Sequence, residues 1–320
     1  MHGNYNPIQT SGMPLAEKLK NMTWDRRQAN SFMITSITGV SLVRPYDCTG
    51  GYLVVERNLN LYMSDEIKIS IVTIVYNGER EIERTIKSVI SQTYKNIEYV
   101  LVDGASKDNT MQIVEPYREC FHTIISEPDK GIYNAMNKGL GVVSGDYVIF
   151  VNSGDCLASN DVLERVVDSI RKESQLPDMV YGNYRESGDS ALEKEIPCYC
   201  HERVWYGMFA SHQSIFYRLG LLRDNNIMFD ETYKVAADYK FTLQVVIKGR
   251  SFLRFPICIS SFDITGISCQ NQDLGLYEAD RIRKEVLNMS WIKRYGIILT
   301  SKTSRYVKKY LGFLYKLYRY

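Results

Sequence analysis

The chain has 320 residues and a mass of 37.0 kDa, which suits one large α/β domain with smaller attachments. Hydrophobic residues make up 45% and charged residues 24%, the composition of an ordinary globular protein. The formal net charge of +2 argues against nucleic acid as a general partner.

The seven cysteines are odd in number and irregularly spaced, which favours free thiols in a reducing compartment. Cys198, Cys200 and His201 could suggest a zinc site. We reject that interpretation because neither a fourth ligand nor C-x2-C spacing is evident.

The first residues, Met1 to Thr10, are polar and lack the apolar core of a secretory signal. No uninterrupted apolar run approaches the roughly 20 residues that a membrane-spanning helix needs. We therefore expect a cytoplasmic protein, or one peripheral on the inner face of the cell membrane.

Residues 1–62 show no sustained periodicity, so we interpret them as an N-terminal extension that is weakly ordered or appended. The sequence then predicts a main domain over 63–270, which opens on the β-branched run Ile69 to Val75. Further strands are predicted at 99–102, 123–125 and 147–151, and helical spacing occurs around 82–90, 111–117, 132–140 and 162–170. Alternating strands and helices predict a mostly parallel sheet, with ligands beyond the carboxyl ends of its strands.

Residues 178–270 are less regular. Strands are predicted at 179–181, 214–217 and 252–259, and a helix at 238–248 that Gly249 ends.

Polar residues follow the predicted strands where a ligand would bind. Asp103 could serve only as a turn residue, or its carboxylate could bind a nucleobase or ribose. Asp155, with Asn152 three residues before it, also fits a turn, but its position beside the other strand ends favours a site for a divalent cation that bridges two phosphates.

Two further segments also have a structural and a functional interpretation. Lys130, near the start of the helix that carries Asn137, could bind phosphate oxygens or lie in a charged loop. Asp238 begins a helix, so it could be an N-cap or a general base, and His212 with Gln213 could line an acceptor pocket.

In this order and spacing, the segments resemble glycosyltransferase family 2, and in particular bacterial surface-polysaccharide glycosyltransferases, over about Lys68 to Ser268. The matching pieces are ISIVTIVYN (69–77), VDGASKDNT (102–110), EPDKGIYNAMN (127–137), GDYVIFVNSGD (145–155), His212-Gln213 and Ala237-Asp238. The resemblance implies an α/β protein with the GT-A fold, a Rossmann-like, mostly parallel central sheet flanked by helices.

The resemblance also implies an inverting enzyme that moves a sugar from a nucleotide-diphosphate donor to the hydroxyl of a glycan or lipid-linked acceptor. Nucleotide binding would fall to Thr73, Tyr76, Asn77 and Asp103, joined by Lys130 and Asn137. Asp155 and Asn152 would hold Mn²⁺ or Mg²⁺, Asp238 would be the catalytic base, and His212 and Gln213 would meet the acceptor.

Two departures from the family pattern matter. The metal motif reads Asn152-Ser-Gly-Asp155, which keeps at most one of the usual carboxylates, and Ala237 replaces an acidic neighbour of Asp238. The second change leaves less like-charge repulsion to raise the pKa of Asp238. The alternatives are a sugar-phosphate nucleotidyltransferase and a non-catalytic nucleotide- or sugar-binding module.

Residues 271–320 are predicted to form a helical, basic and aromatic tail. From Trp291 to Tyr320 there are eight Lys or Arg and no Asp or Glu; removing that +8 from the total of +2 leaves about −6 for 1–290. Such a helix suits an anionic membrane surface, or could pack on the domain with its basic face in water.

Overall fold

The computed structural model describes residues 32–37, 40–45, 66–187, 194–263 and 271–310. The chain forms two compact units, Met1–Met63 and Ser64–Tyr320. In the first unit, β1 (Phe32–Ile37) pairs antiparallel with β2 (Val40–Pro45), a pairing that the sequence did not predict. The expected boundaries at 62 and 270 stay predictions.

A sheet in the order β5-β4-β3-β6-β10-β8-β11-β7 is the centre of the second unit, and β9 pairs with β8. The strands β3 (Ile69–Val75), β4 (Ile97–Asp103), β5 (Thr123–Ser126) and β6 (Tyr147–Phe150) are parallel to one another. The strand β10 (Ile215–Arg218) runs antiparallel to β6 and to β8 (Met179–Ser187), and β11 (Phe252–Asp263) runs parallel to β8. The short strands β7 (Cys156–Leu157) and β9 (Lys194–Ile196) complete the sheet. The predicted α/β, mostly parallel architecture is confirmed.

This order brings polar strand ends to one edge of the sheet. The carboxyl ends of β3, β4, β5 and β6 lie there because the strands are parallel. The reversed strand β10 adds its amino end, which follows the 3-10 helix His212–Ser214. Segments far apart in sequence therefore meet at this edge.

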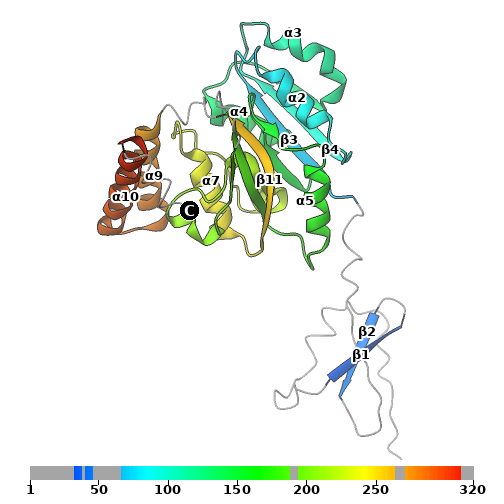
Figure 1. Cartoon of the computed structure of the whole chain (residues 1–320). Helices are drawn as coiled ribbons and strands as arrows, with labels where there is room; N and C mark the ends of the chain where they lie inside the picture. The colour runs from blue at the N-terminus through cyan, green and yellow to red at the C-terminus, as the bar shows by residue number, and fades with distance from the viewer. Residues whose placement is uncertain (1–31, 38–39, 46–65, 188–193, 264–270, 311–320) are drawn as a thin grey trace, which may run out of the picture. The chain divides into compact units, whose positions relative to one another are not determined.

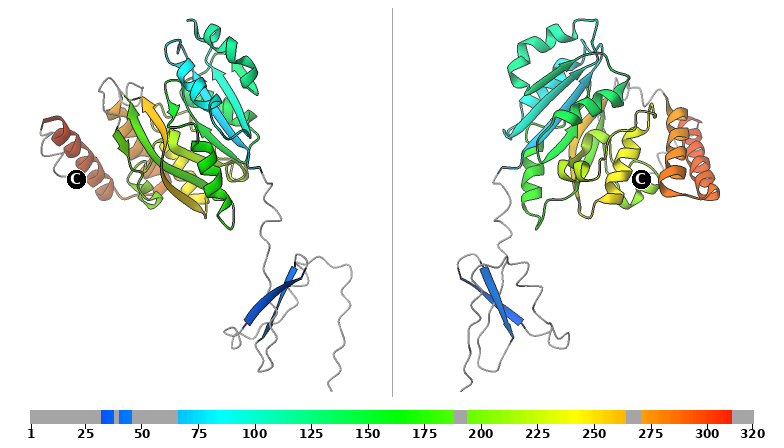
Figure 2. Two further views of the ribbon diagram at one scale, coloured as in Figure 1. Left: turned by 45° about the vertical axis from the view of Figure 1, so that its right-hand side comes forward. Right: turned by 180° about the vertical axis from the view of Figure 1, so that it is seen from behind.

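Helices cover both faces of the sheet. The helices α4 (Ile132–Val142) and α7 (Ala237–Lys248) lie on one face, and α2 (Ile82–Ile90) and α5 (Val162–Arg171) lie on the other (Figures 1 and 2). Alternate residues of β3, Val72 and Ile74, join the core under α4 and α7, as the two-residue period of a strand requires. The helix α4 packs closely on β3, because a Cβ on Gly139 would lie 2.5 Å from Cγ1 of Val72.

The remaining helices are α3 (Thr110–Val114), α6 (Leu219–Asp224), α9 (Gln272–Leu287) and α10 (Trp291–Tyr310). The helix predicted over 111–117 ends early, because Pro116 lacks an amide hydrogen and the chain continues as a 3-10 helix, Glu115–Cys120. The predicted C-terminal helices are present, and α10 packs on α9 (Figure 1). Within the described ranges, no helix combines the length and apolarity needed to cross a membrane.

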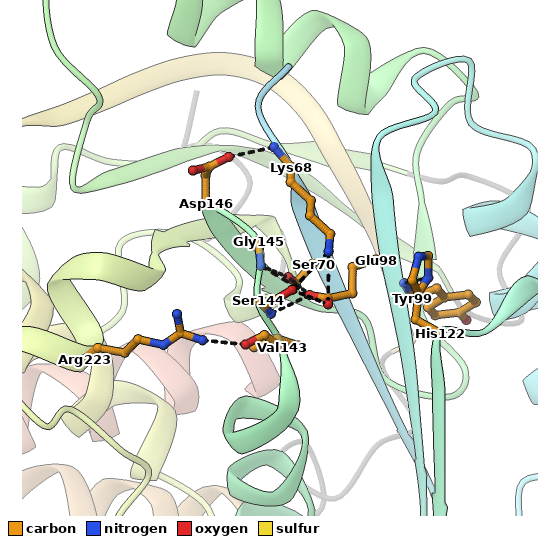
Figure 3. Close-up of polar contacts among 10 residues, drawn as sticks. All are labelled: Lys68, Ser70, Glu98, Tyr99, His122, Val143, Ser144, Gly145, Asp146 and Arg223. Carbon is orange, nitrogen blue, oxygen red and sulfur yellow. Dashed lines mark hydrogen bonds and ion pairs between the residues drawn. The ribbon is translucent and has the colours of Figure 1, made fainter. Parts of the chain in front are cut away.

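At the amino ends of the central strands, the buried carboxylate of Glu98 joins β3, β4 and the turn before β6 (Figure 3). It accepts hydrogen bonds from Lys68 Nζ (3.2 Å), Ser70 Oγ (2.5 Å), the amide and hydroxyl of Ser144 (both 2.6 Å) and the amide of Gly145 (3.2 Å). Burial alone would raise the pKa of this carboxyl, but these donors hold the pKa of Glu98 down at about 2.

Candidate active site

Asn77 and Asp103 are brought together by the turn after β4. Asp103 is buried and accepts hydrogen bonds from the amide (3.1 Å) and hydroxyl (2.5 Å) of Ser106 and from the hydroxyl of Ser126 (2.7 Å). The amide of Asn77 donates to the same Ser106 hydroxyl (2.8 Å), and its side-chain oxygen accepts from the amide of Lys107 (2.8 Å). These contacts give the ends of β3 and β4 a defined shape.

Tyr76 is 59% exposed beside this turn. A Cβ on Gly104 would lie 3.3 Å from the Tyr76 ring and 2.4 Å from a carboxylate oxygen of Asp129, so the three residues are neighbours. Lys130 is exposed next to Asp129, at the start of α4. Tyr76 and Lys130 are therefore accessible to a ligand at this edge.

Two of the predicted nucleotide-binding residues form hydrogen bonds to the backbone of neighbouring segments. Thr73 is fully buried, and its hydroxyl donates to the carbonyl of Val151 (2.7 Å). Asn137 bonds both the carbonyl and the amide of Phe229 (2.9 Å each) through its side-chain amide. Because their polar atoms hold neighbouring backbone, we leave Thr73 and Asn137 out of the proposed nucleotide site.

The turn after β6 is held from two sides. Asp155 is buried and accepts a hydrogen bond from Gln213 Nε2 (2.8 Å), while its carbonyl accepts from the hydroxyl of Thr85 on α2 (2.8 Å). Arg84 donates to the carbonyl of Gly154, whose φ of 99° is in the left-handed region that favours glycine. The side-chain oxygen of Asn152 is buried and has no hydrogen-bond partner in the described part of the chain.

A cavity of about 280 Å³ opens at this edge of the sheet, and four predicted site residues line it: Asn152, His212, Gln213 and Asp238. Asp155 lies behind Gln213, one hydrogen bond away. Asn77 and Asp103 are not among the lining residues. The other lining residues are mostly apolar or aromatic: Ile132, Tyr133, Met136, Tyr184, Glu186, Ile196, Pro197, Tyr199, Met208, Phe209, Ala210, Ser211 and Phe262.

Asp238 lies at the start of α7 and accepts a hydrogen bond from the amide of Tyr239 (2.8 Å). Burial raises the pKa of Asp238 to about 6, and the negative charge of Glu278 acts in the same direction. A carboxylate with this pKa is ionised near neutral pH and still binds a proton well, as a general base must. Ala237 provides no acidic neighbour, but burial and the charge of Glu278 on α9 raise the pKa of Asp238 as such a neighbour would.

His212 is neutral at physiological pH. Burial lowers the pKa of His212 to about 4, and its ring stacks on Phe150 with centroids 5.3 Å apart. Neither ring nitrogen has a partner within the described residues, so both remain able to form a hydrogen bond at the cavity wall.

Comparison with known proteins identifies the family. A model described as glycosyl transferase family 2 matches residues 70–233, slightly more than half of the chain. The chain belongs to glycosyl transferase family 2. An uncharacterized glycosyltransferase of Mycobacterium tuberculosis is 27% identical over 218 residues, which cover 67% of this chain and 82% of that protein. A PGL/p-HBAD biosynthesis glycosyltransferase of Mycobacterium bovis is 30% identical over 185 residues, 55% of this chain and 68% of the relative.

Solved structures agree on the fold. S. aureus TarS (residues 1–349) in complex with UDP has a TM-score of 0.57 at 23% identity, over 72% of this chain and 70% of that chain. The mannosyltransferase PcManGT from Pyrobaculum calidifontis, in complex with GDP-Man and Mn²⁺, has a TM-score of 0.52 at 16% identity, over 67% and 64% of the two chains. The resemblance to family 2 and the GT-A fold are confirmed, and the protein is a nucleotide-sugar glycosyltransferase.

The structural neighbour PcManGT, solved with Mn²⁺, suggests a divalent cation, and the residues of the turn at 152–155 fit one. No group of three or more His, Cys, Asp and Glu side chains is placed to hold a metal within the described ranges. However, the unpartnered oxygen of Asn152 and the carboxylate of Asp155 are the hard oxygen ligands that Mg²⁺ and Mn²⁺ prefer, and Mg²⁺ commonly uses one or two carboxylates plus substrate phosphates. The Asn152-Ser-Gly-Asp155 motif of this family 2 chain is therefore compatible with a cation whose remaining ligands would be phosphate oxygens of the donor.

Sequence reasoning missed several residues that shape this family 2 site. Thr85 and Arg84 hold the turn at 152–155 from α2, and Ser106 and Ser126 hold Asp103. One local signal was available: Thr85 is a polar residue on the apolar face of α2, which indicates a buried hydrogen-bond partner. Glu278 left no local signal, since an acidic residue in an amphipathic helix normally faces water.

Proposed function

We propose that this glycosyltransferase is an inverting enzyme of bacterial cell-surface polysaccharide synthesis, in which Asp238 removes the proton from an acceptor hydroxyl. The observation that carries the proposal is the cavity that Asp238 shares with Asn152, His212 and Gln213, where burial raises the pKa of Asp238 to about 6. A base with this pKa can collect a proton at neutral pH without being protonated beforehand.

The donor nucleotide is assigned to the ends of β3 and β4. Asp103 would accept hydrogen bonds from the base or ribose, Asn77 and exposed Tyr76 would contact the nucleotide, and Lys130 would lie near the phosphates. The printed ligands of two structural neighbours, UDP-GlcNAc for TarS and GDP-Man for PcManGT, support a nucleotide-sugar donor.

The proposed reaction is a single displacement at the anomeric carbon of the donor sugar. The acceptor oxygen, losing its proton to Asp238, attacks the anomeric carbon from the side opposite the departing nucleoside diphosphate, which inverts that carbon. A bound cation, held by Asp155 and Asn152, would neutralise the negative charge of the diphosphate. Gln213 would position Asp155 through its 2.8 Å hydrogen bond, while its own side-chain oxygen accepts from the Ser211 hydroxyl (2.6 Å) at the cavity wall.

The cavity lining supports an uncharged acceptor such as a glycan. Asp238 and Glu186 are the only charged side chains among the lining residues described, and both are carboxylates. Most of the remaining lining residues are apolar or aromatic, and the rings of Tyr184 and Tyr199 offer flat faces to the C–H groups of a sugar ring.

Asp155→Ala tests the donor and metal assignment. We expect the variant to lose most of the gain in nucleoside-diphosphate affinity that Mn²⁺ provides, because it removes the one carboxylate of the motif. Titration calorimetry with UDP and with GDP, with and without Mn²⁺, measures this gain. Asp161→Asn, a half-exposed carboxylate six positions later, is the matched control. An unchanged Mn²⁺ effect in Asp155→Ala contradicts the metal assignment.

We also propose that α10 contacts an anionic membrane surface. Its two arginines form ion pairs with α9, Arg294 with Asp280 (2.7 Å) and Arg305 with Asp273 (2.9 Å). Its outward face is apolar instead: Ile292, Tyr295, Leu299 and Tyr306 are 64%, 61%, 54% and 60% exposed. An apolar stripe on the solvent side, flanked by exposed Lys293 and Lys302, is typical of interfacial helices and suits a lipid-linked acceptor.

The double variant Tyr295→Ser, Leu299→Ser should therefore float poorly with anionic liposomes, with a loss of roughly tenfold or more in partitioning, since each buried apolar side chain contributes about 1.5–3 kcal/mol. Flotation of the full chain measures this. Thr303→Ser, at an exposed position of the same helix, should float like the wild type. Equal flotation of all three proteins would remove α10 from membrane binding.

A further inference from the structure

A carboxylate from the C-terminal helices holds the chain directly before the proposed base. Glu278 lies in the middle of α9 and is 6% exposed. It accepts hydrogen bonds from three consecutive backbone amides, those of Lys234, Val235 and Ala236, each at 2.9 Å. A carboxylate that accepts several amide hydrogen bonds is held firmly and fixes the backbone that donates them.

The clamped segment leads straight into the site. Residues 234–236 end where α7 begins at Ala237, and Asp238 is the next residue. The other side of the segment is held by α4, whose Tyr133 hydroxyl donates to the carbonyl of Val235 (2.6 Å). Glu278 and Tyr133 thus hold both the amide and the carbonyl of Val235, three residues before Asp238.

The charge of Glu278 also acts on Asp238. The titratable groups that influence Asp238 are Tyr133 on α4, Tyr217 on β10 and Glu278 on α9. The hydroxyls of Tyr133 and Tyr217 are hydrogen-bonded to Val235 and Thr242, and burial raises the pKa of both tyrosines, so both are neutral.

Two other ionisable groups lie close by. His212 in the same cavity is neutral, and Arg283 on α9 is engaged by the carbonyls of Trp205 (3.3 Å) and Tyr206 (2.5 Å). Glu186 on β8 also lines this cavity, and Glu278 is the carboxylate whose negative charge raises the pKa of Asp238.

We propose that Glu278 is a positioning residue for the transfer reaction, which holds Asp238 in place through residues 234–236 and contributes a fixed negative charge beside it. The inference rests on the proposed role of Asp238 as base. It assigns part of the catalytic apparatus to α9, which lies outside the region 70–233 that the family model matches. Two substitutions of Glu278 separate its two roles: glutamine removes the charge but keeps the length, and aspartate keeps the charge but shortens the side chain.

The test uses the full chain with Glu278→Gln and Glu278→Asp. Glu278→Gln keeps an acceptor oxygen but removes the charge, so the acid limb of the pH profile of kcat should move to lower pH by about 0.5 unit or more, and the plateau should fall roughly tenfold. Glu278→Asp keeps the charge but shortens the reach, so its plateau should fall while its acid limb stays near that of the wild type. Nucleoside-diphosphate affinity should stay within about twofold in both variants, since the proposed nucleotide site is at the ends of β3 and β4 and Glu278 is on α9.

Asp273→Asn is the control, because Asp273 is on the same helix but its side chain is 91% exposed; its pH profile should match the wild type. An acid limb that does not move in Glu278→Gln overturns the inference, as does a parallel loss of nucleotide affinity and turnover in both Glu278 variants. If Asp238→Asn itself keeps full turnover, the proposed base has failed instead, so the two failures are distinguishable.

Discussion

Replacing Asp238 with asparagine is expected to lower kcat by roughly 10²- to 10⁴-fold, the usual contribution of a general base. The amide is nearly the same size and can still accept the hydrogen bond from the Tyr239 amide, so nucleoside-diphosphate binding should be kept. Release of nucleoside diphosphate in the presence of acceptor measures turnover, and calorimetry measures binding. Full turnover in Asp238→Asn would remove this residue from the base role.

The same substitution should leave the protein as stable as the wild type or more stable at pH 7.5. The folded-state pKa of Asp238 is about 6, above its ordinary value of 3.8, so protonation of Asp238 stabilises the folded state. This stabilisation is fully present below about pH 3.8 and is lost as the pH rises through about 6. Above that pH, the folded protein holds an ionised carboxylate in a poorly solvated place, and asparagine removes that cost, up to about 3 kcal/mol for a pKa raised from 3.8 to about 6.

Urea unfolding at several pH values tests this stability effect. The advantage of Asp238→Asn should shrink toward pH 4, and an advantage that grows there contradicts the raised pKa. In the wild type, kcat should fall as the pH drops below about 6, because Asp238 becomes protonated.

Replacing Glu98 with glutamine is expected to lower the free energy of unfolding by about 3 kcal/mol at pH 7, since the pKa of Glu98 is held at about 2 against an ordinary 4.5. Glutamine offers one acceptor oxygen and introduces donor hydrogens among groups that already donate, so buried donors of Ser144, Ser70 or Gly145 lose their partner. Denaturant unfolding followed by circular dichroism measures the loss.

The pH dependence identifies the cause. Because the folded-state pKa is depressed, the stabilisation by Glu98 is present above about pH 4.5 and is lost as the pH falls toward about 2, so wild type and Glu98→Gln should converge there. Glu115→Gln is the control, since its side chain is 66% exposed and it pairs only with nearby Arg118 at 3.5 Å. A stability difference that does not depend on pH would show that packing, and not the charge, is responsible.

Part of the candidate site could be predicted because its signals are local. The strand ends at Asn77, Asp103 and Asn152 follow apolar runs directly, and the polar break after each run places it at the ligand-binding edge of a parallel sheet. The local pattern does not distinguish ligand-binding side chains from those that hold the fold together. Thr73 and Asn137 match the family motif, yet their polar atoms bond Val151 and Phe229, partners that only the folded chain brings near.

The sequence by itself determined the alternation of strands and helices, the parallel run β3 to β6 and the family, because hydrophobic periodicity and turn residues act over a few neighbouring positions. Only the tertiary structure decided that β10 enters the sheet reversed and brings His212 and Gln213 to the strand ends, and that Glu278 reaches the amides before Asp238. Strand pairing, and the burial that sets the pKa of a carboxyl, depend on contacts between residues distant in sequence, and these exist only once the chain has folded.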